Sequence, residues 1–208
     1  MNDPTKILLS ADELATLRNK AFFERKHQIN QKIYHHFAHI LNVSNDRNIF
    51  AGINFPPGTD FLTGKISKGE NYLGLPYLLL DFPRNFKPDH VLAIRTMIWW
   101  GNFISCTLLI GGNALPAMRQ VIVGQKSNLI KAEISICVNE SPWHHHFEKS
   151  NYRPLHEYSK IALTNLMQTQ SFVKISRKLS LRSINRLEPF VLESFGSYAA
   201  ILKRVLNG

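Results

Sequence analysis

Cysteine is scarce in this sequence, which contains only Cys106 and Cys137 among its 208 residues. Both stand in strand-like segments, and no closely spaced metal or redox motif surrounds either of them. Small secreted domains depend on several cysteine pairs, so this count argues against a disulfide framework. We expect two free thiols in the core.

Charge and long apolar runs are also in short supply. Charged residues make up 19% of the chain, below the roughly 25% of an ordinary soluble domain, and this favours self-association. The amino terminus, residues 1–4, lacks the basic stretch of a signal peptide, and no apolar run is long enough to cross a membrane. We therefore expect a cytoplasmic protein with no membrane partner.

The charge that is present is mostly positive. The 25 lysines and arginines exceed the 15 acidic residues by 10, and residues 151–208 contribute 6 of that excess. This is a basic protein, and any anion-binding surface is expected near its carboxyl end.

Local patterns predict an α+β fold. Apolar residues at spacings of three and four follow a capping box at Ser10, which predicts one long N-terminal helix over residues 11–42. Two more helices are predicted at residues 156–169 and from Pro189 onward. Extended segments are predicted at residues 72–82, 91–100, 103–110, 129–138 and 172–181. The sequence thus indicates one α+β domain over residues 1–208, an antiparallel sheet of about five strands with three flanking helices, and a loop-rich connection at residues 44–70.

The clearest local feature is a hairpin around two adjacent tryptophans. Gly101 and Asn102 separate two extended segments, which favours a type II′ turn. Because neighbouring side chains of a strand point to opposite faces, Trp99 and Trp100 are expected on different sides of the sheet. Both faces then carry apolar side chains, and each needs cover from helices, a ligand or a second subunit.

Turn formers, tyrosines and paired charges surround the predicted strand that precedes this hairpin. Asp81 is expected to pair either with Arg84 or with Arg95, and Arg95 has Glu70 as a second choice. Such groups at a sheet end mark a pocket in some proteins and a structural anchor in others. The candidate ligand-binding residues are Trp99, Arg95, Tyr72, Tyr77, Asp81 and Arg84.

Three consecutive histidines form the most unusual string in the chain. In an extended backbone, His144 and His146 point to the same side, where Glu148 or His156 would complete a metal shell. A polar, pH-sensitive binding loop, or a structural or incidental run of histidines, explains the same residues without a metal. The candidate metal ligands are His144, His146 and His156.

Basic residues recur along the last predicted strand and beyond it, at Lys174, Lys178, Arg182 and Arg186. Such a stripe would bind phosphates of a nucleic acid or another anion. Lysines on a solvated edge strand also prevent aggregation without any ligand. Both interpretations stay open.

These observations favour a non-catalytic binding or interaction protein, a homodimer, that covers an apolar sheet face with a partner subunit or a small ligand. Two alternatives are a metal-dependent enzyme or sensor that uses the histidine loop, and nucleic-acid or anion binding through the basic C-terminal quarter. The sequence has no nucleophile elbow, dinucleotide fingerprint or complete phosphate loop, so nothing in it supports an enzyme. No cofactor is predicted apart from the transition metal of the first alternative.

Overall fold

A computed structural model describes residues 5–208; residues 1–4, the segment assessed above for a signal peptide, lie outside that range. The centre of the molecule is one antiparallel sheet with the strand order β1-β2-β3-β4-β7-β5-β6. Its strands are β1 (Lys65–Tyr72), β2 (Leu75–Asn85), β3 (Leu92–Trp99), β4 (Phe103–Gly111), β5 (Ser135–Cys137), β6 (Tyr152–Pro154) and β7 (Phe172–Ser180).

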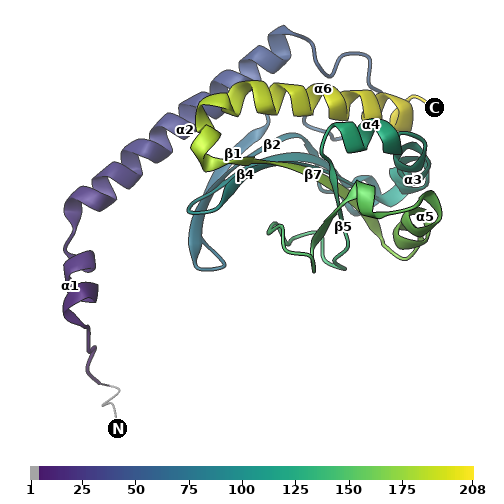
Figure 1. Cartoon of the computed structure of the whole chain (residues 1–208). Helices are drawn as coiled ribbons and strands as arrows, with labels where there is room; N and C mark the ends of the chain where they lie inside the picture. The colour runs from purple at the N-terminus through teal and green to yellow at the C-terminus, as the bar shows by residue number, and fades with distance from the viewer. Residues whose placement is uncertain (1–4) are drawn as a thin grey trace.

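The longer helices gather on one face of this sheet. The helices are α1 (Ala11–Leu17), α2 (Lys20–Asp46), α3 (Leu115–Gly124), α4 (Lys126–Lys131), α5 (Lys160–Gln168) and α6 (Leu187–Leu206), and 3-10 turns include η3 (Leu155–Glu157) and η4 (Leu181–Arg186). Helices α2 and α6 lie across the sheet, with α3 and α5 beside one end, and the chain around β5 extends to the opposite side (Figure 1). Within residues 5–208, no helix is both long and apolar enough to cross a bilayer.

The α+β class and the antiparallel sheet are confirmed, but the element count is wrong. Seven strands and six α-helices occur in residues 5–208, against about five strands and three helices expected. Part of the predicted loop is strand β1, and the predicted strand at residues 129–138 is the end of α4 followed by the short β5. The predicted long first helix breaks at Asn19, whose Oδ1 accepts a hydrogen bond from Phe22 N at 3.0 Å and so caps α2.

The tryptophan hairpin forms, with a different turn from the one expected. Trp99 pairs with Phe103, which leaves three residues in the loop. Asn102 N donates to Trp99 O at 3.1 Å, and Gly101 has φ +73°, so the positive φ falls at the third residue of the turn. A type II′ turn needs it at the second residue, so that prediction is wrong.

The two tryptophans belong to different cores. Trp100, the first of the three loop residues, packs against the helix-side core that contains Ile94 and Ile98. Trp99 lies on the other face in a small cluster with Leu79 and Met97. Cys106 and Cys137 are both buried and free, as the sequence predicted.

Strand β7 is an inner strand, so its interpretation as a solvated edge is wrong. One side of β7 pairs with β4 along its whole length. The other side pairs with β5 at only two positions, Ser135 with Ser176 and Ile136 with Ile175. The sheet therefore buries the first half of β7 and leaves residues 177–180 without a strand on that side.

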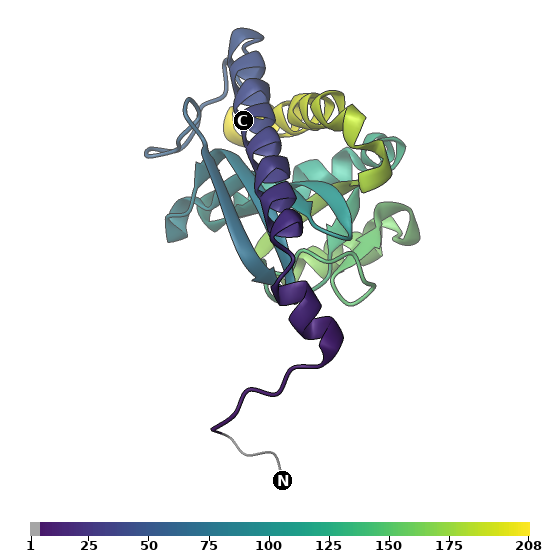
Figure 2. The same cartoon turned by 90° about the vertical axis from the view of Figure 1, so that its left-hand side faces the viewer.

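The N-terminal segment reaches beyond the body of the protein. Helix α1 and the first part of α2 extend past the sheet in Figure 1, and Figure 2 shows α1 projecting beyond the strands. No residue of α1 is buried, and the buried residues of α2 begin at Ile33. Only the second half of α2 belongs to the core.

Candidate functional site

A row of polar side chains crosses the face of the sheet opposite the helices, called the open face below. Asp81, Arg95, Thr107 and Ser176 pair in register across four neighbouring strands, and cross-strand partners share a face. Two short bonds join the carboxylate and the guanidinium: Arg95 Nε to Asp81 Oδ1 at 2.7 Å and Arg95 Nη2 to Asp81 Oδ2 at 2.8 Å. The hydroxyls of Thr107 and Ser176 are 2.7 Å apart. A bidentate ion pair and a hydroxyl pair therefore lie side by side on the sheet.

The segment between β5 and β6, residues 138–151, folds over this row and is called the His-loop below. Its main chain is held from three directions. Lys174 Nζ donates to Pro142 O at 3.0 Å and to His144 O at 2.6 Å. Asn151 Nδ2 donates to the carbonyls of His144 and His146, and both His145 N and His146 N donate to the hydroxyl of Tyr72.

His145 is the residue that the His-loop inserts toward the polar row. Its Nε2 lies 3.3 Å from Arg95 Nη1. Burial and the nearby positive charges of Arg95 and Lys174 lower the pKa of His145 from 6.5 to about 3, so the ring is neutral at physiological pH. Beside it lies a cavity of about 10 Å³, lined in part by Arg95, Thr107, His145 and Lys174. That volume holds roughly one water molecule.

Lys174 is the least expected residue of the site. It is 1% exposed although it carries an ammonium group. Burial lowers its pKa from 10.5 to about 8; the Cys137 thiol that it contacts acts in the opposite direction, and the charge of Arg95 adds a smaller lowering. No carboxylate in residues 5–208 forms an ion pair with Lys174, since Asp81 is already occupied by Arg95. Two cations and one carboxylate therefore lie under the His-loop, which leaves a net positive charge.

Aromatic rings form a continuous strip beside the polar row. The strip consists of Tyr77, Tyr72, Trp99, Phe103, Phe147 and Tyr152, with successive ring centroids 4.5–6.4 Å apart. Its central ring, Trp99, is only 6% exposed. The indole Nε1 of Trp99 is buried and has no hydrogen-bond partner in residues 5–208. The chain itself thus supplies part of the cover that we expected for this face from helices, a ligand or a second subunit.

The structure brings five of the six candidate ligand-binding residues to this face and separates the sixth. Tyr72, Tyr77, Asp81, Arg95 and Trp99 belong to the polar row or the aromatic strip. Asp81 and Arg95 pair with each other. Glu70, the second candidate partner of Arg95, pairs with Lys26 instead.

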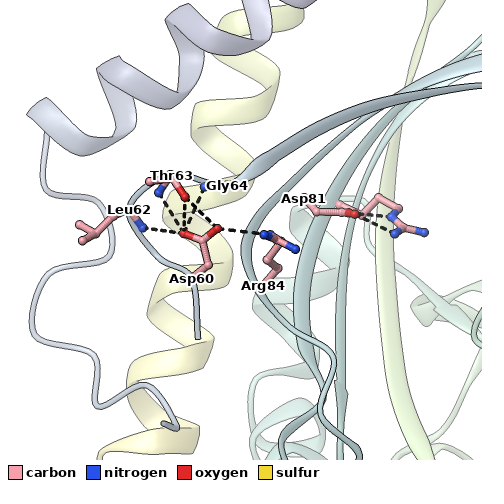
Figure 3. A network of polar contacts seen from close by, with 7 residues as sticks. Asp60, Leu62, Thr63, Gly64, Asp81 and Arg84 are labelled. Carbon is pink, nitrogen blue, oxygen red and sulfur yellow. Dashed lines mark hydrogen bonds and ion pairs between the residues drawn. The ribbon is translucent and has the colours of Figure 1, made fainter. Parts of the chain in front are cut away.

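Arg84 lies outside this site, in a polar network of its own. Its Nε pairs with Asp60 Oδ2 at 3.3 Å, while Asp81 points elsewhere (Figure 3). Burial raises the pKa of the Asp60 carboxyl, but hydrogen bonds from Thr63, Gly64 and Leu62 outweigh it and lower the pKa overall. The same bonds hold the turn before β1, so this network is an anchor for the loop.

The candidate metal ligands come together only in part. The rings of His144 and His146 lie with centroids 5.7 Å apart, and His146 Nδ1 is 3.9 Å from Glu148 Oε2. His156 lies in η3 with its side chain exposed. Across residues 5–208, no three or more His, Cys, Asp or Glu residues are grouped so as to hold a metal ion.

The four basic candidates are also divided. Lys174 lies beneath the His-loop, whereas Lys178, Arg182 and Arg186 are exposed. Lys178 and Arg186 line a cavity of about 340 Å³ together with Arg177, Glu133 and Glu193. Two carboxylates thus offset part of the positive charge there.

Sequence reasoning missed that the His-loop and the polar row form one site. Asn151 and Ser176 were not candidates, and Lys174 was assigned to a surface stripe. One signal was available, because Lys174 lies within a strand whose neighbours Val173 and Ile175 are apolar, a context that buries side chains on both faces. The sequence matches no family model and no curated protein, so the arrangement of these residues is the ground for a function.

Proposed function

We propose that this protein binds a small organic anion on the open face of the sheet, beneath the His-loop. The observation that carries the proposal is the buried ammonium of Lys174, which contacts two backbone carbonyls, the Cys137 thiol and the Tyr152 ring and has no carboxylate partner in residues 5–208. The proposal keeps the expectation of a cytoplasmic binding protein and names no reaction.

Charge balance supports an anionic ligand. A buried charge is costly unless a counter-charge and hydrogen bonds replace the lost water. Asp81 neutralises Arg95, and no carboxylate in the described part of the chain pairs with Lys174. A carboxylate or phosphate placed between Arg95 and Lys174 would accept charge-assisted hydrogen bonds from both and remove the excess charge.

The aromatic strip supports a ligand with an apolar body. Small-molecule sites are lined mainly by apolar and aromatic side chains, with a few polar groups that fix the ligand's orientation. Here Arg95, Thr107 and Lys174 are the polar groups, while Met97 and Trp99 continue along the same face. The Nε1 of Trp99 would donate to an acceptor at the far end of the ligand.

Binding requires the His-loop to move. The cavity of about 10 Å³ admits no organic ligand, because His145 and Trp143 occupy the space above Arg95. The bonds that close the loop come from Lys174, Asn151 and Tyr72, so a ligand must compete with them. The measured affinity will therefore be weaker than that of the open site by the fraction of molecules that are open.

A panel of simple probes tests the proposal. The probes are benzoate and phenyl phosphate, with benzyl alcohol as the neutral counterpart, titrated by calorimetry. We expect the anions to bind and the alcohol to bind at least tenfold more weakly, which is the scale of one charge-assisted hydrogen bond. The variant Lys174→Met should weaken anion binding about tenfold or more and leave the alcohol unaffected or slightly favoured, because the loop is then less firmly held.

Lys178→Met is the matched control. Lys178 lies four residues further along β7 on the same face, but it is exposed. Its ammonium lies over the Phe147 ring, 5.4 Å from the centroid, whereas the hydrogen bonds to the carbonyls of Pro142 and His144 come from Lys174. Anion affinity should stay within about twofold of that of the unchanged protein. If Lys174→Met and Lys178→Met weakened binding equally, or if the alcohol bound as tightly as benzoate, the proposed site would be wrong.

The other interpretations of the sequence receive less support from the geometry. A partner subunit over the open face would find Trp99 already covered. A metal would have the neighbouring pair His144 and His146 with Glu148 near His146, and residues 5–208 contain no group of three or more His, Cys, Asp or Glu residues that could hold it. Of the four basic residues proposed to bind nucleic acid, Lys174 is buried and the other three are exposed.

A further inference from the structure

The N-terminal arm, defined as residues 7–32, carries large apolar side chains that the protein does not bury. The exposed fractions are 90% for Ile7, 67% for Leu8, 45% for Leu9, 45% for Leu14, 64% for Leu17, 49% for Phe22, 48% for Phe23 and 37% for Ile29. Both views show the arm projecting from the body (Figures 1 and 2). A short helix such as α1 gains little stability in water without packing, so this conformation needs a partner surface.

The apolar face of the arm continues the face that α2 buries in the core. With about 100° of rotation per residue, Phe22 and Ile29 lie within about 40° of Ile33 around the helix axis. Ile33 is 6% exposed and Phe37 is fully buried against the sheet. This stripe therefore runs from the core onto the first half of α2. Lys26, paired with Glu70 of β1, interrupts it between Phe22 and Ile29, and these two apolar side chains stay partly exposed.

Charge along the arm is segregated. Helix α1 has Asp12 and Glu13 in its first turn and no basic residue in its last. The segment that follows, residues 18–32, contains five basic residues, Arg18, Lys20, Arg25, Lys26 and Lys32, and one acidic residue, Glu24. The arm is thus acidic at one end and basic at the other, so it is complementary to a copy of itself that runs in the opposite direction.

We infer that the N-terminal arms of two copies of this chain pack antiparallel about a two-fold axis. Helix α1 of each copy lies on the first half of α2 of the other. Leu14 and Leu17 cover Phe22 and Ile29 across the interface, and Asp12 of one copy faces Arg25 of the other. The arms, and not the open face of the sheet, make the homodimer.

The available area is sufficient for such a dimer. Taking about 180 Å² for a fully exposed large apolar side chain, the eight side chains of one arm expose about 800 Å². A specific interface buries roughly 800 Å² on each partner and at least about 1,000 Å² in total. Two arms exceed the lower figure even if a third of their apolar area stays exposed.

The first test measures mass in solution by light scattering, using the full chain and the double variant Leu17→Asp, Phe22→Asp. The unchanged chain should give twice 23.8 kDa and the variant 23.8 kDa, with association weakened about 100-fold or more. The monomer fold should be retained, because neither side chain is buried in one chain. Ile161→Asp is the matched control: Ile161 is 76% exposed on α5, outside the arm, and its replacement should leave the dimer intact.

A charge exchange identifies the second copy as the partner. Asp12→Lys alone and Arg18→Glu, Arg25→Glu alone each place like charges across both halves of the dimer, and each should weaken association about tenfold. Mixing the two variants should restore a dimer that contains one copy of each. Glu13 is left unchanged because it completes the capping box with Ser10.

Three outcomes would overturn the inference. One is a mass of 23.8 kDa for the unchanged chain at 100 µM, whether or not the arm then binds anionic vesicles. Another is a dimer that survives Leu17→Asp, Phe22→Asp. The third is a failure of the two charge variants to pair when they are mixed.

Discussion

Acid should loosen the His-loop through His145. In the closed structure the pKa of His145 is about 3, because the ring is buried and faces the charges of Arg95 and Lys174, with His144 and His146 nearby. In the unfolded chain its pKa is about 6.5. At pH values between these two pKa values, the unfolded state binds a proton that the folded state does not bind. The contribution of His145 to the free energy of unfolding is therefore fully present above pH 6.5 and is lost as the pH falls below it.

The size of this effect follows from the two pKa values. At pH 5, an unfolded pKa of about 6.5 and a folded pKa of about 3 give a loss of about 2 kcal/mol relative to pH 7.5. Urea unfolding at pH 7.5 and pH 5.0 measures the loss directly. His145→Gln is the control, because glutamine cannot take up the proton; its own loss between the two pH values should be about 2 kcal/mol smaller.

Two results would refute this reasoning. One is an equal loss of stability in the unchanged protein and in His145→Gln. The other is an NMR titration in which the ring of His145 takes up a proton near pH 6.5 while the protein stays folded, since that would mean that the ring is solvated and that the loop does not hold it against Arg95.

Three further predictions concern stability, each measured as the free energy of unfolding in urea. Asn151→Ala should cost about 2–3 kcal/mol, because Asn151 is fully buried and donates to two His-loop carbonyls; unchanged protection of the loop amides in hydrogen exchange would argue against this. Asp81→Asn should cost about 3 kcal/mol by leaving its arginine partner without a counter-charge, and a loss below 1 kcal/mol would mean that solvent already screens the pair. Gly112→Ala should cost 2 kcal/mol or more, since φ is +65° and the new Cβ would lie 2.4 Å from Asp89 O; Gly124→Ala, with nothing within 4 Å, should change stability by less than about 1 kcal/mol, and equal effects at the two glycines would contradict the geometry.

The central strands could be predicted from the sequence because their apolar content is high on both faces. Strands β3, β4 and β7 fell within two residues of the expected segments. Strand β1 could not be found in this way, since Lys65–Tyr72 is mostly polar and exposed at the sheet edge and offers no alternation. Helix α3 did have a signal: Leu115, Met118 and Ile122 recur at spacings of three and four, and all three are buried.

The spacing of apolar residues did not identify the shortest elements. The apolar residues between Leu129 and Val138 suggest one strand, but α4 ends at Lys131 and β5 has only three residues. Periods of 2.0 and 3.6 residues cannot be distinguished over three to six positions. Two strands were missing from the expected sheet: β6, which has only three residues, and β1, whose polar sequence gives no alternation.

The site was predictable only where it follows from pairing within the sheet. The contact between Asp81 and Arg95 was one of the alternatives, because both strands were foreseen. The contacts of the His-loop join residues about 30 positions apart, Lys174 with Pro142 and His144, and no local pattern encodes them. A strand position can be deduced from alternation, whereas the path of a long loop over a sheet depends on the whole fold.

The way in which Lys174 holds the His-loop separates closure from recognition. Its ammonium donates hydrogen bonds to the main-chain oxygens of residues 142 and 144, and every amino acid has such an oxygen. Replacing the side chains at these positions would therefore alter what the loop presents to a ligand without removing the hydrogen bonds that keep the loop closed. Position 174 must keep its lysine, because the side chain itself makes this contact. Selectivity for a ligand can therefore change through the loop side chains while Lys174 stays the same.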